Sequence, residues 1–189
     1  QSNKYGGGTE SNLPLTLKGR ELIAEMERAG IILDLAHMND RSAYQALEAF
    51  HGVVINSHSN CRTLVDGSRQ ISDELISEVA SRGGVIGIMP WAPLIKPLWN
   101  NASKKQEFNL ADVVDHVDHI FHLTGSTKHV GIGSSFDGGF GNEQTPREID
   151  TIADMPRLEQ ALSERGFTQD DIRDIMYKNW LRILTACLK

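Results

Sequence analysis

The chain has 189 residues, of which 40% are hydrophobic, and this is enough to bury the core of one domain. Its net charge of −6 argues against nucleic-acid binding, which requires a basic face. No apolar run approaches the roughly 20 residues that a membrane-spanning helix needs. Cys61 and Cys187 are far apart and form no C-x-x-C pair, so we expect two reduced, isolated thiols.

Helical segments follow a polar N-terminal stretch. Residues 1–14 include three consecutive glycines and show no periodicity, so we expect a loop. Thr16 is the expected N-cap of a first helix that ends at Gly30, and Asp40 is the expected N-cap of a second. Further helices are expected at residues 73–82, 110–123, 156–165 and 169–187, with Ser72, Asn109 and Thr168 as caps.

Four apolar segments between these helices predict the strands of one parallel sheet. They lack polar alternation, as strands do when both faces of the sheet are covered. One helix-sized segment separates each strand from the next, which is typical of right-handed β-α-β units. The strands are expected at residues 31–36, 53–57, 85–89 and 129–134.

Candidate functional residues end successive strands, as they do around the mouth of a (β/α)8 TIM barrel. A doubly wound sheet would usually concentrate its site at one switch point. A complete barrel has eight strands and takes about 250 residues. Four strands in 189 residues therefore predict an α/β chain that supplies about half of such a barrel.

His37 and His58 each follow an apolar strand, in the segments D-L-A-H and N-S-H-S. Neutral imidazole is a common ligand of zinc and related metals. A single histidine near a strand end is usually a hydrogen-bonded structural residue, but two at adjacent strand ends favour a metal site. A catalytic metal normally takes three protein ligands, so further ligands must come from elsewhere.

Other candidates have weaker support. Arg69 lies in the loop after His58, where a guanidinium can bind a substrate carboxylate or simply face solvent. Asp137 follows the fourth strand, as a site carboxylate or as part of an Asp-Gly turn. In the segment Asp115-His116-Val117-Asp118-His119 with His122, positions 115, 118, 119 and 122 share one helix side, and such charge-rich faces are usually solvated surface. Gly131-Ile132-Gly133 lies within a strand end, so it does not predict a dinucleotide site.

Six segments together resemble the renal (membrane) dipeptidase family of zinc peptidases, in family order from about Leu15 to Leu184. Members of that family are (β/α)8 barrels with two bridged zinc ions, so the resemblance implies this fold and this cofactor. The segments are D-L-A-H ending at His37, S-H-S-N around His58, Arg69-Gln70 before S-D-E, R-G-G-V-I-G from Arg82, D-H-V-D-H-I from Asp115 and G-I-G-S-S-F-D-G from Gly131.

The resemblance also implies roles for individual residues. His37 and His58 match the two histidines that hold the second zinc, and Arg69 matches the arginine that binds the dipeptide carboxylate. The family pattern G-S-D-F-D-G has an acidic proton-handling residue where this chain has Ser135, whereas Asp137 matches its second aspartate. A serine hydroxyl is no carboxylate base at neutral pH. Asp137 would replace it only if the strand continued and placed positions 135 and 137 on one face.

The other ligands of the family lie in an N-terminal half: a His-x-Asp on the first strand, a bridging glutamate and a substrate-polarising histidine. This chain has no counterpart of them, so we expect it to be the C-terminal half of a barrel that needs its N-terminal half as partner. The sequence does not determine the cellular compartment, although the cytoplasm is favoured. It also does not determine whether the protein forms a homodimer.

The predicted function is hydrolysis of the dipeptide amide by a hydroxide bridging two metal ions, impaired by Ser135. One alternative is a related amide or lactone hydrolase with a changed substrate, because the anchor for the amino group differs. The other is a relative that binds metal or substrate without catalysis.

Overall fold

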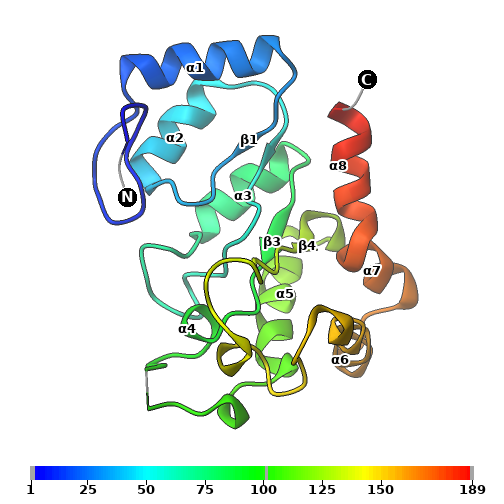
Figure 1. Ribbon diagram of the computed structural model, residues 1–189. Helices are drawn as coiled ribbons and strands as arrows, with labels where there is room; N and C mark the ends of the chain where they lie inside the picture. The colour runs from blue at the N-terminus through cyan, green and yellow to red at the C-terminus, as the bar shows by residue number, and fades with distance from the viewer. Residues whose placement is uncertain (1–2, 101, 188–189) are drawn as a thin grey trace.

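Four short parallel strands lie in chain order at the centre of the fold (Figure 1). The computed structural model describes residues 3–100 and 102–187. β1 pairs with β2 and β3 with β4, and an Asn56–Ile86 bridge links the two pairs. The parallel α/β architecture is therefore as predicted, although four strands do not by themselves form a barrel. The strands are β1 (Leu33–Asp34), β2 (Val54–Ile55), β3 (Ile86–Ile88) and β4 (Val130–Ile132).

Each strand is two or three residues long, which is shorter than the predicted five or six. The chain leaves β1 early because the Asp34 carboxylate accepts a hydrogen bond from the backbone N–H of Ala36 at 3.0 Å, and His37 then takes a left-handed φ of 67°. At β4, a 3-10 turn, η2 (Thr127–His129), replaces the expected first residue of the strand. The loops at the carboxyl edge are correspondingly longer than the sequence predicted.

Local capping explains where the helices begin. Thr16, Ser72 and Asn109 cap their helices as predicted, through side-chain oxygens that accept backbone N–H groups. The second helix differs, because Asn39 is its N-cap and accepts from the Ser42 N–H at 2.7 Å, while Asp40 is its first residue. The helices are α1 (Leu17–Arg28), α2 (Asp40–Ala49), α3 (Asp73–Ser81), α4 (Ala92–Ile95), α5 (Leu110–Thr124), α6 (Arg157–Arg165), α7 (Gln169–Arg173) and α8 (Asn179–Cys187).

The predicted last helix is interrupted by a π-helical turn, η5 (Asp174–Lys178), between α7 and α8. The turn brings Asn179 and Trp180 to the outer edge of β4. Asn179 Nδ2 donates to the carbonyls of Thr127 and Val130 at 2.7 and 2.8 Å, and Trp180 Nε1 donates to that of Ile132 at 3.1 Å. Side chains at the start of α8 thus hydrogen-bond the backbone carbonyls on this edge of β4.

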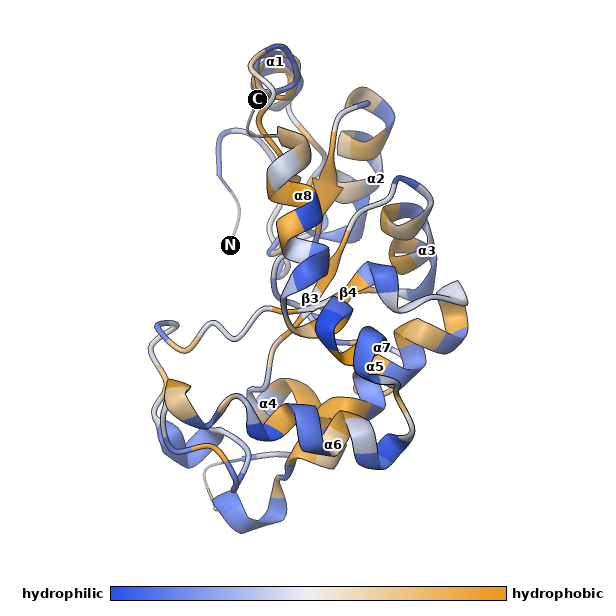
Figure 2. Ribbon diagram, turned by 90° about the vertical axis from the view of Figure 1, so that its right-hand side faces the viewer, coloured by the Kyte–Doolittle hydropathy of each residue, from blue (hydrophilic) through white to orange (hydrophobic). Residues whose placement is uncertain are grey.

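The hydrophobic core lies between the strands and the helices packed on them. Figure 2 shows hydrophobic residues along the strands and on α2 and α3. Val54, Ile86, Ile88 and Val130 are fully buried on the strands. In the described part of the chain, no helix is long and apolar enough to span a membrane.

Candidate functional site

Two imidazoles meet at the carboxyl edge of the sheet. His37 follows β1 and His58 follows β2, and the parallel pairing of these strands places their ends side by side. The Nε2 atoms lie 3.0 Å apart and the ring centroids 5.0 Å apart. The left-handed backbone of His37 is costly for a residue with a Cβ, and such strain is often found where a side chain must be aimed at a functional site.

Arg69 reaches the same pair from the loop before α3. Its guanidinium donates to Ser59 Oγ at 2.9 Å and to the His58 carbonyl at 2.7 Å. It also lies 3.3 Å from His37 Nε2. Because a guanidinium has no acceptor, His37 Nε2 must present its lone pair to this contact. The structure thus brings together the three residues that the sequence singled out first.

Both imidazoles are held neutral. Burial lowers the pKa of His37 and of His58 from 6.5, and the positive charge of Arg69 lowers both further. The carboxylates of Asp34 and Asp137 act on the pKa of His58 in the opposite direction, with smaller effect. Neutral imidazole is the form that coordinates metal, so at neutral pH the pair is ready to act as ligands.

Asp34 and Ser57 form a hydrogen-bonded chain behind His58 that sequence reasoning missed. Ser57 Oγ lies 2.5 Å from Asp34 Oδ2 and 2.6 Å from His58 Nδ1. The second Asp34 oxygen accepts the backbone N–H of Ser57 at 3.0 Å. The sequence does contain a signal for this chain of hydrogen bonds, because Asp34 in I-L-D-L and Ser57 in I-N-S-H are polar residues within segments that predict buried strands.

Two glycines let the end of β2 approach β3 and β4. A Cβ on Gly87 or on Gly133 would lie 2.0 Å from the backbone oxygen of Ser57. A Cβ on Gly133 would also lie 3.1 Å from His58 Cα. Because neither glycine has a side chain, the backbone of Ser57 and His58 can pack directly against Gly87 and Gly133. This close packing requires glycine at both positions.

Ser135 and Asp137 lie in a turn after β4. The backbone N–H of Gly138 donates to the Ser135 carbonyl at 2.8 Å, and Ser135 has a left-handed φ of 49°. β4 already ends at Ile132, so the condition under which Asp137 would replace the acidic residue, a strand that continues and places positions 135 and 137 on one face, is not met. Asp137 is exposed in the turn, and its charge nevertheless acts on His58.

The acidic and histidine side chains of α5 are used in contacts with protein. Asp115 and Asp118 both pair with Arg165, and His119 pairs with Asp73 at 2.8 Å. His116, in contrast, is buried, and its Nδ1 accepts the backbone N–H of Cys61 at 3.0 Å. Burial lowers the pKa of His116 to about 4. Burial also raises the pKa of the Cys61 thiol, so this residue is a structural, unreactive cysteine.

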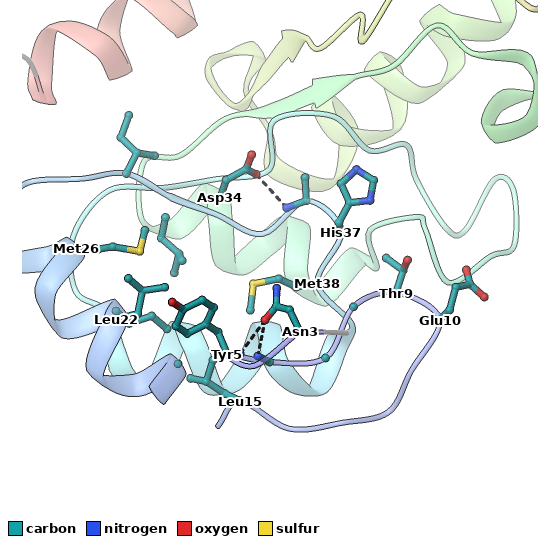
Figure 3. A pocket seen from close by; sticks show the side chains of 18 residues that line it. Asn3, Tyr5, Thr9, Glu10, Leu15, Leu22, Met26, Asp34, His37 and Met38 are labelled. Carbon is teal, nitrogen blue, oxygen red and sulfur yellow. Dashed lines mark hydrogen bonds between the residues drawn. The ribbon is translucent and has the colours of Figure 1, made fainter. Parts of the chain in front are cut away.

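A cavity of about 750 Å³ opens beside His37, between the N-terminal segment, α1 and β1. Figure 3 shows Asp34 and His37 on the β1 side of this cavity, with Tyr5 and Leu15 across from them. Its walls combine apolar side chains, among them Leu22 and Met26, with these polar groups. The cavity is thus large enough for a small ligand or for additional polypeptide next to His37.

The donor chemistry of the pair fits zinc. Two ligand nitrogens on a tetrahedral zinc, each bonded at about 2.0–2.1 Å, lie about 3.3 Å apart. The observed 3.0 Å between the Nε2 atoms is close to this value. Within residues 3–100 and 102–187, no group of three or more His, Cys, Asp or Glu residues is placed to hold a metal. The described residues thus bring two ligand-type nitrogens together, one fewer than the three that a catalytic zinc normally takes from protein.

Comparison with known proteins identifies the family. The model of the membrane dipeptidase family (Peptidase family M19) matches residues 2–188. An uncharacterized dipeptidase of Schizosaccharomyces pombe is 31% identical over 93% of this chain and 41% of its own length. Dipeptidase aclJ of Aspergillus oryzae is 31% identical over 90% of this chain and 38% of its own. The chain thus spans less than half the length of these curated relatives.

Solved structures agree on the fold. A metallopeptidase from Rhodobacter sphaeroides, crystallised with a phosphinate mimic of the dipeptide L-Ala-D-Ala, matches 97% of this chain and 50% of its own, at a TM-score of 0.84 and 24% identity. An amidohydrolase from Pseudomonas aeruginosa matches 97% of this chain and 61% of its own, at a TM-score of 0.84 and 26% identity. The family resemblance predicted from sequence motifs is confirmed. The chain belongs to the membrane dipeptidase family, Peptidase family M19.

Proposed function

We propose that this chain forms the C-terminal part of a zinc-dependent hydrolase that cleaves the amide bond of dipeptides. The observation that carries the proposal is the convergence of His37 Nε2 and His58 Nε2 at 3.0 Å, with the Arg69 guanidinium beside them. Membership of a family of dipeptidases supports the substrate class. The metallopeptidase named above, solved with a dipeptide mimic, supports a metal as the cofactor.

On this proposal the chain is one half of a (β/α)8 barrel, and an N-terminal half supplies the remaining metal ligands. Its length relative to the relatives supports this arrangement. The backbone N–H groups of Leu33 and Leu35 donate at 3.0 Å to the carbonyls of Val53 and Ile55, just before and within β2. The alternate backbone groups, at Asp34, therefore point away from β2. This edge of β1 borders the cavity, where another strand could pair.

The chain's own residues have three tasks in the reaction. His37 and His58 would hold one zinc through Nε2, and zinc when bound would supply a Lewis acid and an activated water. Arg69 would bind the substrate carboxylate by charged hydrogen bonds, which a guanidinium makes in a bidentate geometry. Ser59 Oγ and the His58 carbonyl orient the guanidinium for this task. The cavity leaves His37, which lines it, accessible to a ligand.

The turn at Ser135 favours a second candidate, a related hydrolase that acts on another amide or on a lactone. A serine there offers no charge to pair with a substrate ammonium and no carboxylate base. Asp137 is exposed two residues further in the turn. A substrate without a free amino group would have no need of an acidic group at position 135.

The metal site is tested by replacing each histidine with alanine in the full-length protein. His37→Ala and His58→Ala should each remove about one equivalent of zinc, measured by elemental analysis after dialysis. His122→Ala is the matched control, because His122 is an exposed histidine of α5. Unchanged zinc content in both site variants would rule out the assignment. Turnover of L,L- and L,D-dipeptides, N-acyl amino acids and lactones then separates the two candidate functions.

A further inference from the structure

We propose that Asp34 and Ser57 are positioning residues that hold His58 in the tautomer with its proton on Nδ1, which leaves Nε2 free for metal. The inference rests on the proposed metal site and adds how the protein prepares it. It is carried by the hydrogen-bonded chain that runs from the Asp34 carboxylate through the Ser57 hydroxyl to the imidazole of His58. Each proton in this chain can be placed by counting donors.

The single proton of the Ser57 hydroxyl goes to Asp34. An ionised carboxylate only accepts, and Asp34 Oδ1 already accepts the backbone N–H groups of Ala36 and Ser57 at 3.0 Å. Asp34 Oδ2 lies 2.5 Å from Ser57 Oγ, a distance typical of a hydroxyl donating to a carboxylate. Without a proton between them, two oxygens this close would repel each other. The carboxylate therefore takes the hydroxyl proton.

The proton on His58 follows from that assignment. Ser57 Oγ, having donated to Asp34, can only accept from His58 Nδ1, which lies 2.6 Å away. Nδ1 must then carry the imidazole proton. Nε2 is left with its lone pair, and it points at His37 Nε2.

An independent contact fixes the same state at His37. The Arg69 guanidinium can only donate, so the His37 Nε2 that it contacts at 3.3 Å also presents a lone pair. Two lone pairs that face each other across 3.0 Å repel in the metal-free protein, and a cation bound between them would turn this repulsion into attraction. The protein thus sets both rings in their ligand form, and metal binding requires no tautomer exchange at His58.

Asp34→Asn is the informative substitution because it reverses the direction of the chain. The asparagine oxygen can keep the two backbone N–H contacts, which leaves its NH₂ group facing Ser57. Ser57 would then accept from Asn and donate to His58 Nδ1, and the proton of His58 would move to Nε2. Ser57→Ala removes the hydroxyl, whereas Ser57→Thr retains it and should rescue the tautomer.

The experiment measures tautomer and metal affinity separately in the full-length protein. Histidine ring nitrogens are labelled with ¹⁵N, and the metal-free protein is studied by NMR, with the His58 signals assigned by comparison with His58→Asn. Zinc affinity is measured by competition with a chelator. Asp170→Asn and Ser77→Ala are matched controls, because both residues are exposed on helices away from the strand ends.

We expect the Nδ1–H tautomer in the wild-type protein and in Ser57→Thr, and the Nε2–H tautomer in Asp34→Asn. Outer hydrogen-bond partners of metal ligands typically contribute about 10–100-fold to affinity, so Asp34→Asn and Ser57→Ala should bind zinc more weakly by about this factor. A wild-type His58 with its proton on Nε2 would overturn the inference even if zinc binds and even if a variant fails to fold. A wild-type protein that binds no zinc, yet shows the Nδ1–H tautomer, would instead overturn the proposed function.

Discussion

Gly133→Ala tests whether the close approach of β2 to β4 positions the site. The added Cβ would lie 2.0 Å from the Ser57 carbonyl oxygen and 3.1 Å from His58 Cα. The nearest atoms are backbone, so no side-chain rotation relieves the clash, and reaching an ordinary contact of about 3 Å requires a shift of about 1 Å. A misplacement of this size typically costs about 100-fold in rate, or about 2.7 kcal/mol.

The assay is kcat/KM for the best dipeptide substrate of the full-length protein, together with zinc affinity. Gly87→Ala should have a similar effect, because its Cβ would also lie 2.0 Å from the Ser57 oxygen. Gly30→Ala is the control, since its Cβ would meet nothing within 4 Å, so it reports the cost of a side chain at a left-handed φ of 69° without any displacement of β2. A folded Gly133→Ala protein with wild-type kcat/KM and zinc affinity would refute the reasoning.

Two further predictions concern Ser135 and His116. Ser135→Asp should raise kcat for dipeptides tenfold or more, because acid-base assistance is typically worth about 10²–10⁴-fold. Asp also tolerates the left-handed φ of 49° at this position. If the variant instead loses activity on a non-dipeptide substrate, the second candidate function is favoured. Burial lowers the pKa of His116 from 6.5 to about 4, so between these pH values the unfolded chain binds a proton that the folded chain does not. The free energy of unfolding should therefore fall by up to about 3 kcal/mol as the pH is lowered across this window. His116→Asn retains an acceptor for Cys61 without titrating, and urea unfolding at pH 7 and pH 4.5 should show a smaller loss in the variant; equal losses would contradict the assignment.

The histidine pair was predictable because it depends on two strong, local signals. Uninterrupted apolar runs identify buried parallel strands, and parallel neighbours must end at the same edge. His37 and His58 could therefore be placed side by side from their positions after such runs. Arg69 required more, because an eleven-residue loop has many conformations: its position left substrate binding and solvent exposure open, and only the family resemblance favoured substrate binding.

The hydrogen-bonded chain through Asp34 and Ser57 was not predictable in the same way. The sequence predicted strands that continue to Ala36 and Ser57, which would have turned alternate side chains to opposite faces. The strands end earlier, at Asp34 and Ile55, and the freed backbone lets a carboxylate cap the next N–H groups. Strand length depends on how neighbouring ends diverge, and that is a tertiary property. The same reason explains why Asp137 lies in a turn.

The two edges of the sheet differ in a way that bears on how the site is completed. The Gly133 N–H donates to β3 at 3.0 Å, so the alternate carbonyls at Val130 and Ile132 face away from it, and Asn179 and Trp180 donate to them. A strand added beside β4 would have to displace these bonds. The β1 edge instead borders the cavity that His37 lines. On the proposed function, an N-terminal half that closes the barrel pairs with both edges: beside β1 it meets the edge that borders the cavity, and beside β4 it replaces the hydrogen bonds from Asn179 and Trp180.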